Sequence, residues 1–199
     1  MVRPAKAASY DDPNASWYTD HMRKPTKRDS LCRLAPIDIV TVIDVGVAEK
    51  TESLLAAYPH AKHILIESDP RWIETYPDTY AGIDCVVHVM HASDVSRIDA
   101  MQIDGPVLLK IDVDGGELLV LRGAAGILDR VAIIIVEATA DSLSGIVQFA
   151  EVHRFRLFDI VELCYCGNQL HQCDLIFVAE AFCHLVFTPW SLESYQHFE

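Results

Sequence analysis

A chain of 199 residues with 51% hydrophobic content is long enough for one well-cored α/β domain and too short for two large ones. The formal net charge of −13 argues against a nucleic acid or an anionic membrane surface as the main partner, because both bind basic surfaces. We therefore expect a small-molecule or saccharide partner, and the sequence leaves open whether the chain forms a homodimer.

The beginning of the chain lacks the basic start and apolar run of a signal peptide, and the longest apolar runs, such as Val131 to Val136, are far shorter than a membrane span. We therefore expect a cytoplasmic protein with reduced cysteines. Residues of zinc-ligand type occur within one ten-residue stretch: Cys164, Cys166, His171 and Cys173. This stretch is typical of two strands joined by a turn, so we favour free cysteines over zinc and assign no metal.

Residues 1–35 show no sustained hydrophobic periodicity and are expected to form an N-terminal arm. Basic residues gather there beside Trp17 and Tyr18, namely Arg23, Lys24, Lys27, Arg28 and Arg33. Because the remainder of the chain is acidic, the arm either closes over the core as a lid or pairs with the acidic surface, and we favour the second. We divide the chain into this arm, a domain at 36–180, and a tail at 181–199 packed on the domain.

The stretch from Ile37 to Glu67 predicts a βαβ unit. Ile37 to Val45 is a β-branched run typical of a buried strand, Thr51 to Tyr58 is a helix, and His63 to Ile66 is a second strand. Glu67 follows roughly 20 residues after the turn, where nucleotide-binding folds place an acid that accepts hydrogen bonds from ribose hydroxyls. A nucleoside cofactor is the first hypothesis.

The turn of this unit retains a single glycine, Gly46. A GxGxG pattern begun there has Ala48 and Lys50 at its second and third glycine positions. Lys50 places a Cβ and a charge where a diphosphate approaches the backbone closely, which argues against a loop that binds a dinucleotide. The alternative is a plain strand-to-helix turn without a ligand.

Alternating strands and helices continue to the end of the domain. The predicted elements are a short helix Arg71–Tyr76 opened by Asp69 and Pro70, strands Ile83–Val89, Val107–Val113 and Val131–Val136, helices Glu117–Arg122 and Ser142–His153, and a hairpin of Phe155–Leu163 with Asp174–Val178. This order predicts a doubly wound sheet with one reversed strand. Ligands bind beyond the carboxyl ends of such strands, where five acids converge: Asp44, Glu67, Asp112, Asp114 and Glu137.

The segment Leu108 to Ala124, LLKIDVDGGELLVLRGA, resembles the KIDVEGxExxVLxG pattern of the FkbM family of S-adenosylmethionine-dependent methyltransferases. VIDVG at 42–46, LIESDP at 65–70, IIVEAT at 134–139 and QCDLIFV at 172–178 resemble its other motifs in the same order. The resemblance implies a Rossmann-like class I methyltransferase fold: three layers around a mostly parallel, doubly wound sheet of seven strands with the last antiparallel.

The resemblance also implies roles for individual residues. Asp44, Gly46 and Val47 would lie beside the amino acid part of S-adenosylmethionine, Glu67 would hold its ribose, and Ser68, His91 and Ala92 would flank its adenine. Asp112 would be nearest the transferring methyl group and is our first choice of catalytic base, followed by Glu137, His88 and His91. The alternative is that Asp112 orients the turn or pairs with Lys110 or Arg122. Asp112 and Asp114 fit either a metal site or turn-forming acids.

The family pattern DVGANxGxxS differs from this chain at two positions, since Ala48 replaces the usual Asn and Lys50 the usual Gly. The family implies O-methylation of a hydroxyl on a sugar or secondary metabolite. The alternative is a non-catalytic binding protein that kept the fold with a degenerate cofactor loop. A nicotinamide-dependent oxidoreductase is disfavoured by the missing glycines and by the KIDVDGGE match.

Overall fold

The computed structural model describes residues 26–90 and 103–191. Residues 25–188 form one compact unit. Its strands are β1 (Thr41–Val45), β2 (Lys62–Glu67), β3 (Cys85–Val89), β4 (Val107–Ile111), β5 (Val131–Thr139), β6 (Phe155–Cys166) and β7 (Gln169–Ala179). Its helices are α2 (Lys27–Leu34), α3 (Glu52–Ala57), α4 (Pro70–Ile73), α5 (Tyr76–Thr79), α6 (Glu117–Gly123), α7 (Leu143–Val152) and α8 (Cys183–Val186), with short 3-10 helices η3 (Ala125–Ile127) and η4 (Glu180–Phe182).

The strands form one sheet in the order β3-β2-β1-β4-β5-β7-β6. Strands β1 to β5 pair in parallel, and β7 pairs antiparallel with both β5 and β6. Val45 at the end of β1 pairs with Ile66 of β2 and with Ile111 of β4. This register places Glu67, the last residue of β2, at the same edge of the sheet as Gly46 and Asp112, which directly follow β1 and β4.

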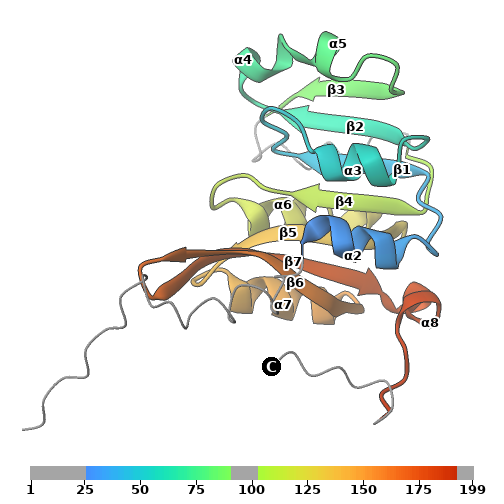
Figure 1. The fold of residues 1–199 in the computed structure, drawn as a ribbon, viewed down its shortest axis with the longest axis vertical. Helices are drawn as coiled ribbons and strands as arrows, with labels where there is room; N and C mark the ends of the chain where they lie inside the picture. Colours follow the sequence, from blue (N-terminus) through green and yellow to red (C-terminus); the bar gives the residue numbers. More distant parts are fainter. Residues whose placement is uncertain (1–25, 91–102, 192–199) are drawn as a thin grey trace, which may run out of the picture. The chain divides into compact units, whose positions relative to one another are not determined.

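Helices cover both faces of the sheet, as Figure 1 shows, with α2 and α3 on one face and α6 and α7 on the other. Leu31 and Leu34 of α2 belong to the same buried cluster as Val42 of β1, while Val120 of α6 and Ile146 of α7 belong to another. Burial on both faces explains why the sequences of β4 and β5 are mostly apolar, with Lys110 and Glu137 as their charged residues. The predicted doubly wound sheet of seven strands with a reversed last strand is confirmed.

Helices on either side of the predicted domain, 36–180, pack against it. Helix α2 lies within the segment assigned to an arm, yet its Leu31 and Leu34 are buried in the core. At the other end, Cys183 of α8 packs into the same cluster. The first part of the arm, with Trp17, Tyr18, Arg23 and Lys24, lies outside the described residues, so its role as a lid or as a partner of the acidic surface stays a prediction.

No helix in the described ranges 26–90 and 103–191 is long and apolar enough to cross a lipid bilayer.

Candidate active site

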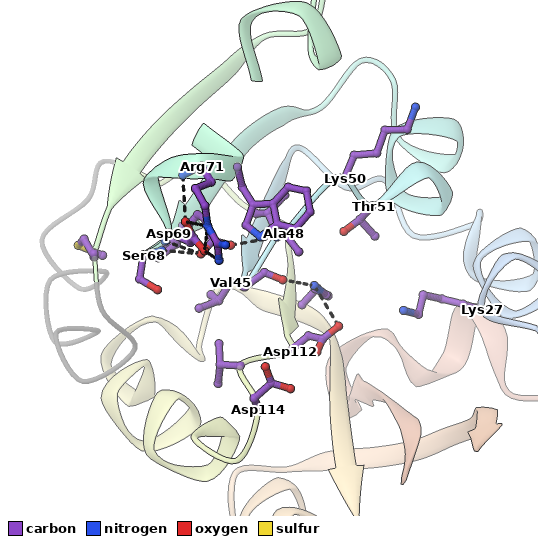
Figure 2. A pocket seen from close by; sticks show the side chains of 18 residues that line it. Lys27, Val45, Ala48, Lys50, Thr51, Ser68, Asp69, Arg71, Asp112 and Asp114 are labelled. Carbon is purple, nitrogen blue, oxygen red and sulfur yellow. Dashed lines mark hydrogen bonds and ion pairs between the residues drawn. The ribbon is translucent and has the colours of Figure 1, made fainter. Parts of the chain in front are cut away.

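A cavity of about 720 Å³ opens where strands β1, β2 and β4 end (Figure 2). This size lies in the range of small-molecule sites, which span roughly 300–1,000 Å³. Of the residues singled out in the sequence, those that line it are Gly46, Val47, Glu67, Ser68, Asp112 and Asp114. The loop after β1 adds Ala48, Lys50 and Thr51, the segment after β2 adds Asp69, Arg71 and Trp72, and α2 adds Lys27.

Gly46 is required by the close approach of two backbone segments. Its φ is +75°, in the left-handed region that favours glycine. A Cβ at this position would lie 1.7 Å from the carbonyl oxygen of Asp112. The Gly46 N–H also donates to the carbonyl oxygen of Ile66 at 2.9 Å. The turn after β1 is therefore pressed against the end of β4, which forms the floor of the cavity.

Lys110 joins the acids that end β1 and β4. Its Nζ lies 3.0 Å from Asp44 Oδ1 and 3.4 Å from Asp112 Oδ2, and it donates to the carbonyl oxygen of Gly46 at 2.7 Å. Burial alone would lower the pKa of Lys110, but the carboxylates of Asp44 and Asp112 outweigh this effect and raise the pKa above its ordinary value. Asp44 is thus a buried ion-pair partner behind the cavity wall, whereas Asp112 faces the cavity.

The carboxylate of Glu67 holds the loops that follow β1 and β2. Its Oε2 accepts the N–H of Ala48 at 2.9 Å, and its Oε1 accepts those of Ser68 and Asp69 at 2.7 and 2.8 Å. A carboxylate offers about four lone-pair positions, so one acceptor position is left for a ligand. The acid predicted to meet a ribose therefore also shapes the loop on which that ribose would lie.

Lys50 does not close the loop. Its Nζ lies 2.9 Å from Glu52 Oε1, and Figure 2 shows the side chain extending away from Ala48, Ser68 and Asp69. The hydrogen bond and charge of Glu52 raise the pKa of Lys50. The ammonium group of Lys50, which stands where the family usually has glycine, is therefore directed to one side of the cavity.

The other predicted acids differ in their access to the cavity. The side chain of Asp112 is 39% exposed and lines the cavity, as does Asp114, whose φ is +53°. Glu137, on β5, is not among the lining residues, and its Oε1 accepts the side-chain N–H of Gln172 at 2.6 Å. Burial, followed by the nearby charge of Asp112, raises the pKa of Glu137 to about 7. Glu137 therefore titrates near neutral pH behind the acid that faces the cavity.

Lys27, which the sequence analysis named only as one of the basic residues of the arm, lines the cavity. Its Nζ lies 2.6 Å from Asp174 Oδ2, and its backbone N–H donates to Glu162 Oε1 at 2.8 Å. Helix α2 is further attached to β6 by the hydrogen bond from Ser30 Oγ to Asp159 Oδ2 at 2.6 Å and by the ion pair of Arg33 with Asp159. The signal that could have revealed this helix is its capping box, Thr26 with Asp29.

The predictions for the histidines, for the partner of Asp112 and for the cysteines have separate outcomes. His88 lies on β3 and is not a lining residue, and His91 and Ala92 lie outside the described residues. Asp112 pairs with Lys110, one of the two partners considered for it. Cys164 and Cys166 are exposed and Cys173 is buried, all as free thiols. In the part of the chain that the structure describes, no three His, Cys, Asp or Glu side chains are arranged to hold a metal.

A seven-stranded sheet in this order with a reversed last strand is the Rossmann-like fold of class I methyltransferases. The sequence matches the Methyltransferase FkbM domain over residues 33–170. The chain belongs to this family of S-adenosylmethionine-dependent methyltransferases. No curated protein matches it in sequence.

Solved structures share the fold at low sequence identity. An rRNA methylase from Streptococcus thermophilus superimposes with a TM-score of 0.56 at 13% identity, covering 79% of this chain and 98% of that one. A precorrin-6y C5,15-methyltransferase from Geobacter metallireducens GS-15 gives 0.54 at 14% identity, with 81% and 96% covered. Aeropyrum pernix fibrillarin, solved with natively bound S-adenosyl-L-methionine, gives 0.53 at 12% identity, with 72% and 68% covered.

Proposed function

We propose that this chain transfers the methyl group of S-adenosylmethionine to a hydroxyl oxygen of a small uncharged acceptor, a sugar or secondary metabolite. The observation that carries the proposal is the 720 Å³ cavity, which is lined both by Glu67, the acid expected to bind a ribose, and by Asp112, the candidate base. The family match supplies the reaction class. The acidity of the chain supports a small acceptor over a nucleic acid.

The residues of the cavity fit S-adenosylmethionine. Glu67 keeps one acceptor position for a ribose hydroxyl after its three backbone hydrogen bonds. Trp72 and Met90 give the same side of the cavity apolar surface suited to an adenine ring. Asp112 and Asp114 supply negative charge suited to a sulfonium centre. Asp44 contributes indirectly, because it holds Lys110 and through it the carbonyl of Gly46.

Bound S-adenosylmethionine would supply an electrophilic methyl group, which an acceptor oxygen takes in an in-line displacement. For such a reaction the chain mainly has to position the two reactants and remove one proton. Asp112 is the acid that lines the cavity, and Lys110 fixes its carboxylate from behind. We assign the proton-accepting role to Asp112. After burial, the charge of Asp112 is the next cause that raises the pKa of Glu137 to about 7.

The charges around the cavity support an uncharged acceptor. Each lysine or arginine among the described lining residues already has a carboxylate partner: Lys27 with Asp174, Lys50 with Glu52, Arg71 with Asp69, and Lys110 with Asp44 and Asp112. Asp114 lines the cavity and has no such cationic partner in residues 26–90 and 103–191. A carboxylate or phosphate on the acceptor would therefore meet uncompensated negative charge.

The first test is calorimetric titration of the full chain with S-adenosylhomocysteine, with NAD as the control ligand. We expect S-adenosylhomocysteine to bind in the micromolar range and NAD not to bind. An acceptor screen then measures the release of S-adenosylhomocysteine in the presence of candidate acceptors. Glucose, glucosamine, glucuronate and glucose 6-phosphate differ in charge, and neutral phenols and alcohols complete the set. Failure to bind S-adenosylhomocysteine would contradict the proposal and favour a non-catalytic protein with this fold.

A further inference from the structure

Ala48, in the loop after β1, has an unusual backbone conformation for its residue type. Its φ is +51°, in the left-handed region that non-glycine residues avoid at a cost of roughly 1–2 kcal/mol. Asparagine adopts this conformation more readily than alanine does. The family usually has asparagine at this position, so this chain lacks the residue that favours the left-handed conformation here.

Two side chains hold the polar backbone groups of Ala48. Its N–H donates to Glu67 Oε2 at 2.9 Å, and its carbonyl oxygen accepts the hydroxyl of Tyr76 at 2.9 Å. Glu67 belongs to a recognised motif, whereas Tyr76 opens α5, a helix without any matched motif. The loop is therefore restrained from opposite sides by groups that lie 19 and 28 residues further along the chain.

Tyr76 is well suited to hold a loop rigidly. Its side chain is buried, lies in a cluster with Val47, Leu65 and Tyr80, and meets Tyr80 edge to face with ring centroids 5.4 Å apart. Burial and then the charge of Glu67 raise the pKa of Tyr76, so its hydroxyl remains a donor throughout the neutral range. Tyr76 is not among the residues that line the cavity, whereas Ala48 is.

We propose that Tyr76 is a positioning residue for the cofactor loop, which it fixes through the carbonyl of Ala48 in place of the left-handed preference that asparagine gives at this position in the family. The proposal rests on the proposed function insofar as the loop binds S-adenosylmethionine. Tyr76 itself does not touch the cofactor. It lowers the cost of ordering the loop on binding, because the left-handed conformation of Ala48 already exists in the free protein.

The test is Tyr76→Phe, which keeps the ring in the cluster and removes only the hydroxyl. We expect the Kd for S-adenosylhomocysteine to rise about three- to tenfold, the effect of one lost hydrogen bond. The matched control is Tyr58→Phe, since Tyr58 is also buried and its hydroxyl has no hydrogen-bond partner among the described residues. The control should leave the Kd unchanged. Equal effects of the two substitutions would overturn the proposal.

A second background separates positioning from general stability. In an Ala48→Asn protein, whose asparagine favours the left-handed conformation, Tyr76→Phe should weaken binding by less than about twofold. An undiminished effect in that background would show that Tyr76 does not act through Ala48 and would overturn the proposal.

A cofactor-free measurement distinguishes failure of this inference from failure of the proposed function. In the free protein, Tyr76→Phe should speed amide hydrogen exchange at Ala48 and its loop neighbours, while Tyr58→Phe should not. If wild-type protein fails to bind S-adenosylhomocysteine, the proposed function fails while the exchange result still decides the role of Tyr76. Unchanged exchange at Ala48 in the Tyr76→Phe protein would overturn that role.

Discussion

The ammonium group of Lys110 lies 3.0 Å from the carboxylate of Asp44, and both side chains are almost completely buried, at 4% and 2% exposure. A lysine in the middle of an apolar strand is explained by this pair, because β1 and β4 are neighbours and Asp44 is in register with Lys110. The same ammonium group also holds Gly46 and Asp112, so one buried charge organises the floor of the cavity.

Replacing Lys110 by Met should cost about 3–5 kcal/mol in the free energy of unfolding, because Asp44 would be left buried without its counter-charge. Urea denaturation measures this loss. The double variant Lys110→Met with Asp44→Asn should recover part of the stability. The control is Lys50→Met, whose exposed pair with Glu52 should matter little. A Lys110→Met protein as stable as wild type would refute the structural role of the pair.

Gly46→Ala should be far more damaging than Gly82→Ala. Both glycines have a positive φ, +75° and +82°, but a Cβ at Gly82 meets nothing within 4 Å, whereas at Gly46 it meets the Asp112 carbonyl oxygen. We expect a loss of about 3–5 kcal/mol at Gly46 and about 1–2 kcal/mol at Gly82. Thermal and urea unfolding give both values, and titration with S-adenosylhomocysteine should show lost binding only at Gly46. Similar losses at the two positions would contradict the packing described for the turn.

Asp112→Asn should separate chemistry from cofactor binding. The amide keeps the size of the side chain but cannot accept a proton, so we expect turnover with an acceptor from the screen to fall by about 10²- to 10⁴-fold. The Kd for S-adenosylhomocysteine should change little. Asp114→Asn removes the neighbouring charge but not the proposed base, and should lower turnover far less at saturating S-adenosylmethionine. If Asp112→Asn keeps wild-type turnover, Asp112 loses its assignment as the base.

Glu137 should make stability depend on pH around neutrality. Its pKa is raised from 4.5 to about 7 in the folded protein, so the folded state binds the proton more tightly than the unfolded chain does. The stability that comes from this proton is complete below pH 4.5 and is lost as the pH rises through about 7. This is tested by the melting temperatures of wild type and Glu137→Gln, measured at pH values between about 5 and 8. Parallel curves for the two proteins would show that Glu137 does not titrate in that range.

Lys50→Ala should leave the Kd for S-adenosylhomocysteine within about threefold of wild type, because the side chain is turned toward Glu52 and its removal uncovers no buried group. Glu52→Ala is a second variant to titrate, because it removes the carboxylate with which Lys50 pairs. A large gain in affinity on removing Lys50 would mean that the lysine obstructs the cavity after all.

The order of the elements was predictable because each buried strand leaves a short apolar run. The predicted strands Val107–Val113 and Val131–Val136 appear in the sheet as β4 (Val107–Ile111) and β5 (Val131–Thr139). Gly167, with a φ of +62°, forms the turn of the predicted hairpin. The start of β1 was wrong for a physical reason. Ile37 and Ile39 are buried, yet pairing begins only at Thr41, so an apolar pattern reports burial rather than hydrogen bonding between strands.

The cavity was predictable only in part, since acids at strand ends follow from the topology but their partners do not. Glu67 and Asp112 were expected at the edge where they lie. The bonds from Lys110 to Gly46 and from Tyr76 to Ala48 join residues 64 and 28 positions apart, and no local pattern records such contacts. The place of Lys27 at the cavity was not predicted, because an eight-residue helix with two buried leucines has too little hydrophobic periodicity to be recognised.

Helix α2 connects the cavity to a part of the sheet that contributes no lining residue in the described chain. Lys27 stands at the cavity, while Glu162, Asp159 and Asp174 of the β6–β7 hairpin hold its helix in place. The cavity wall at Lys27 is thus set by a hairpin that itself contributes no described lining residue. Family members that methylate different acceptors are therefore expected to differ at these three hairpin positions.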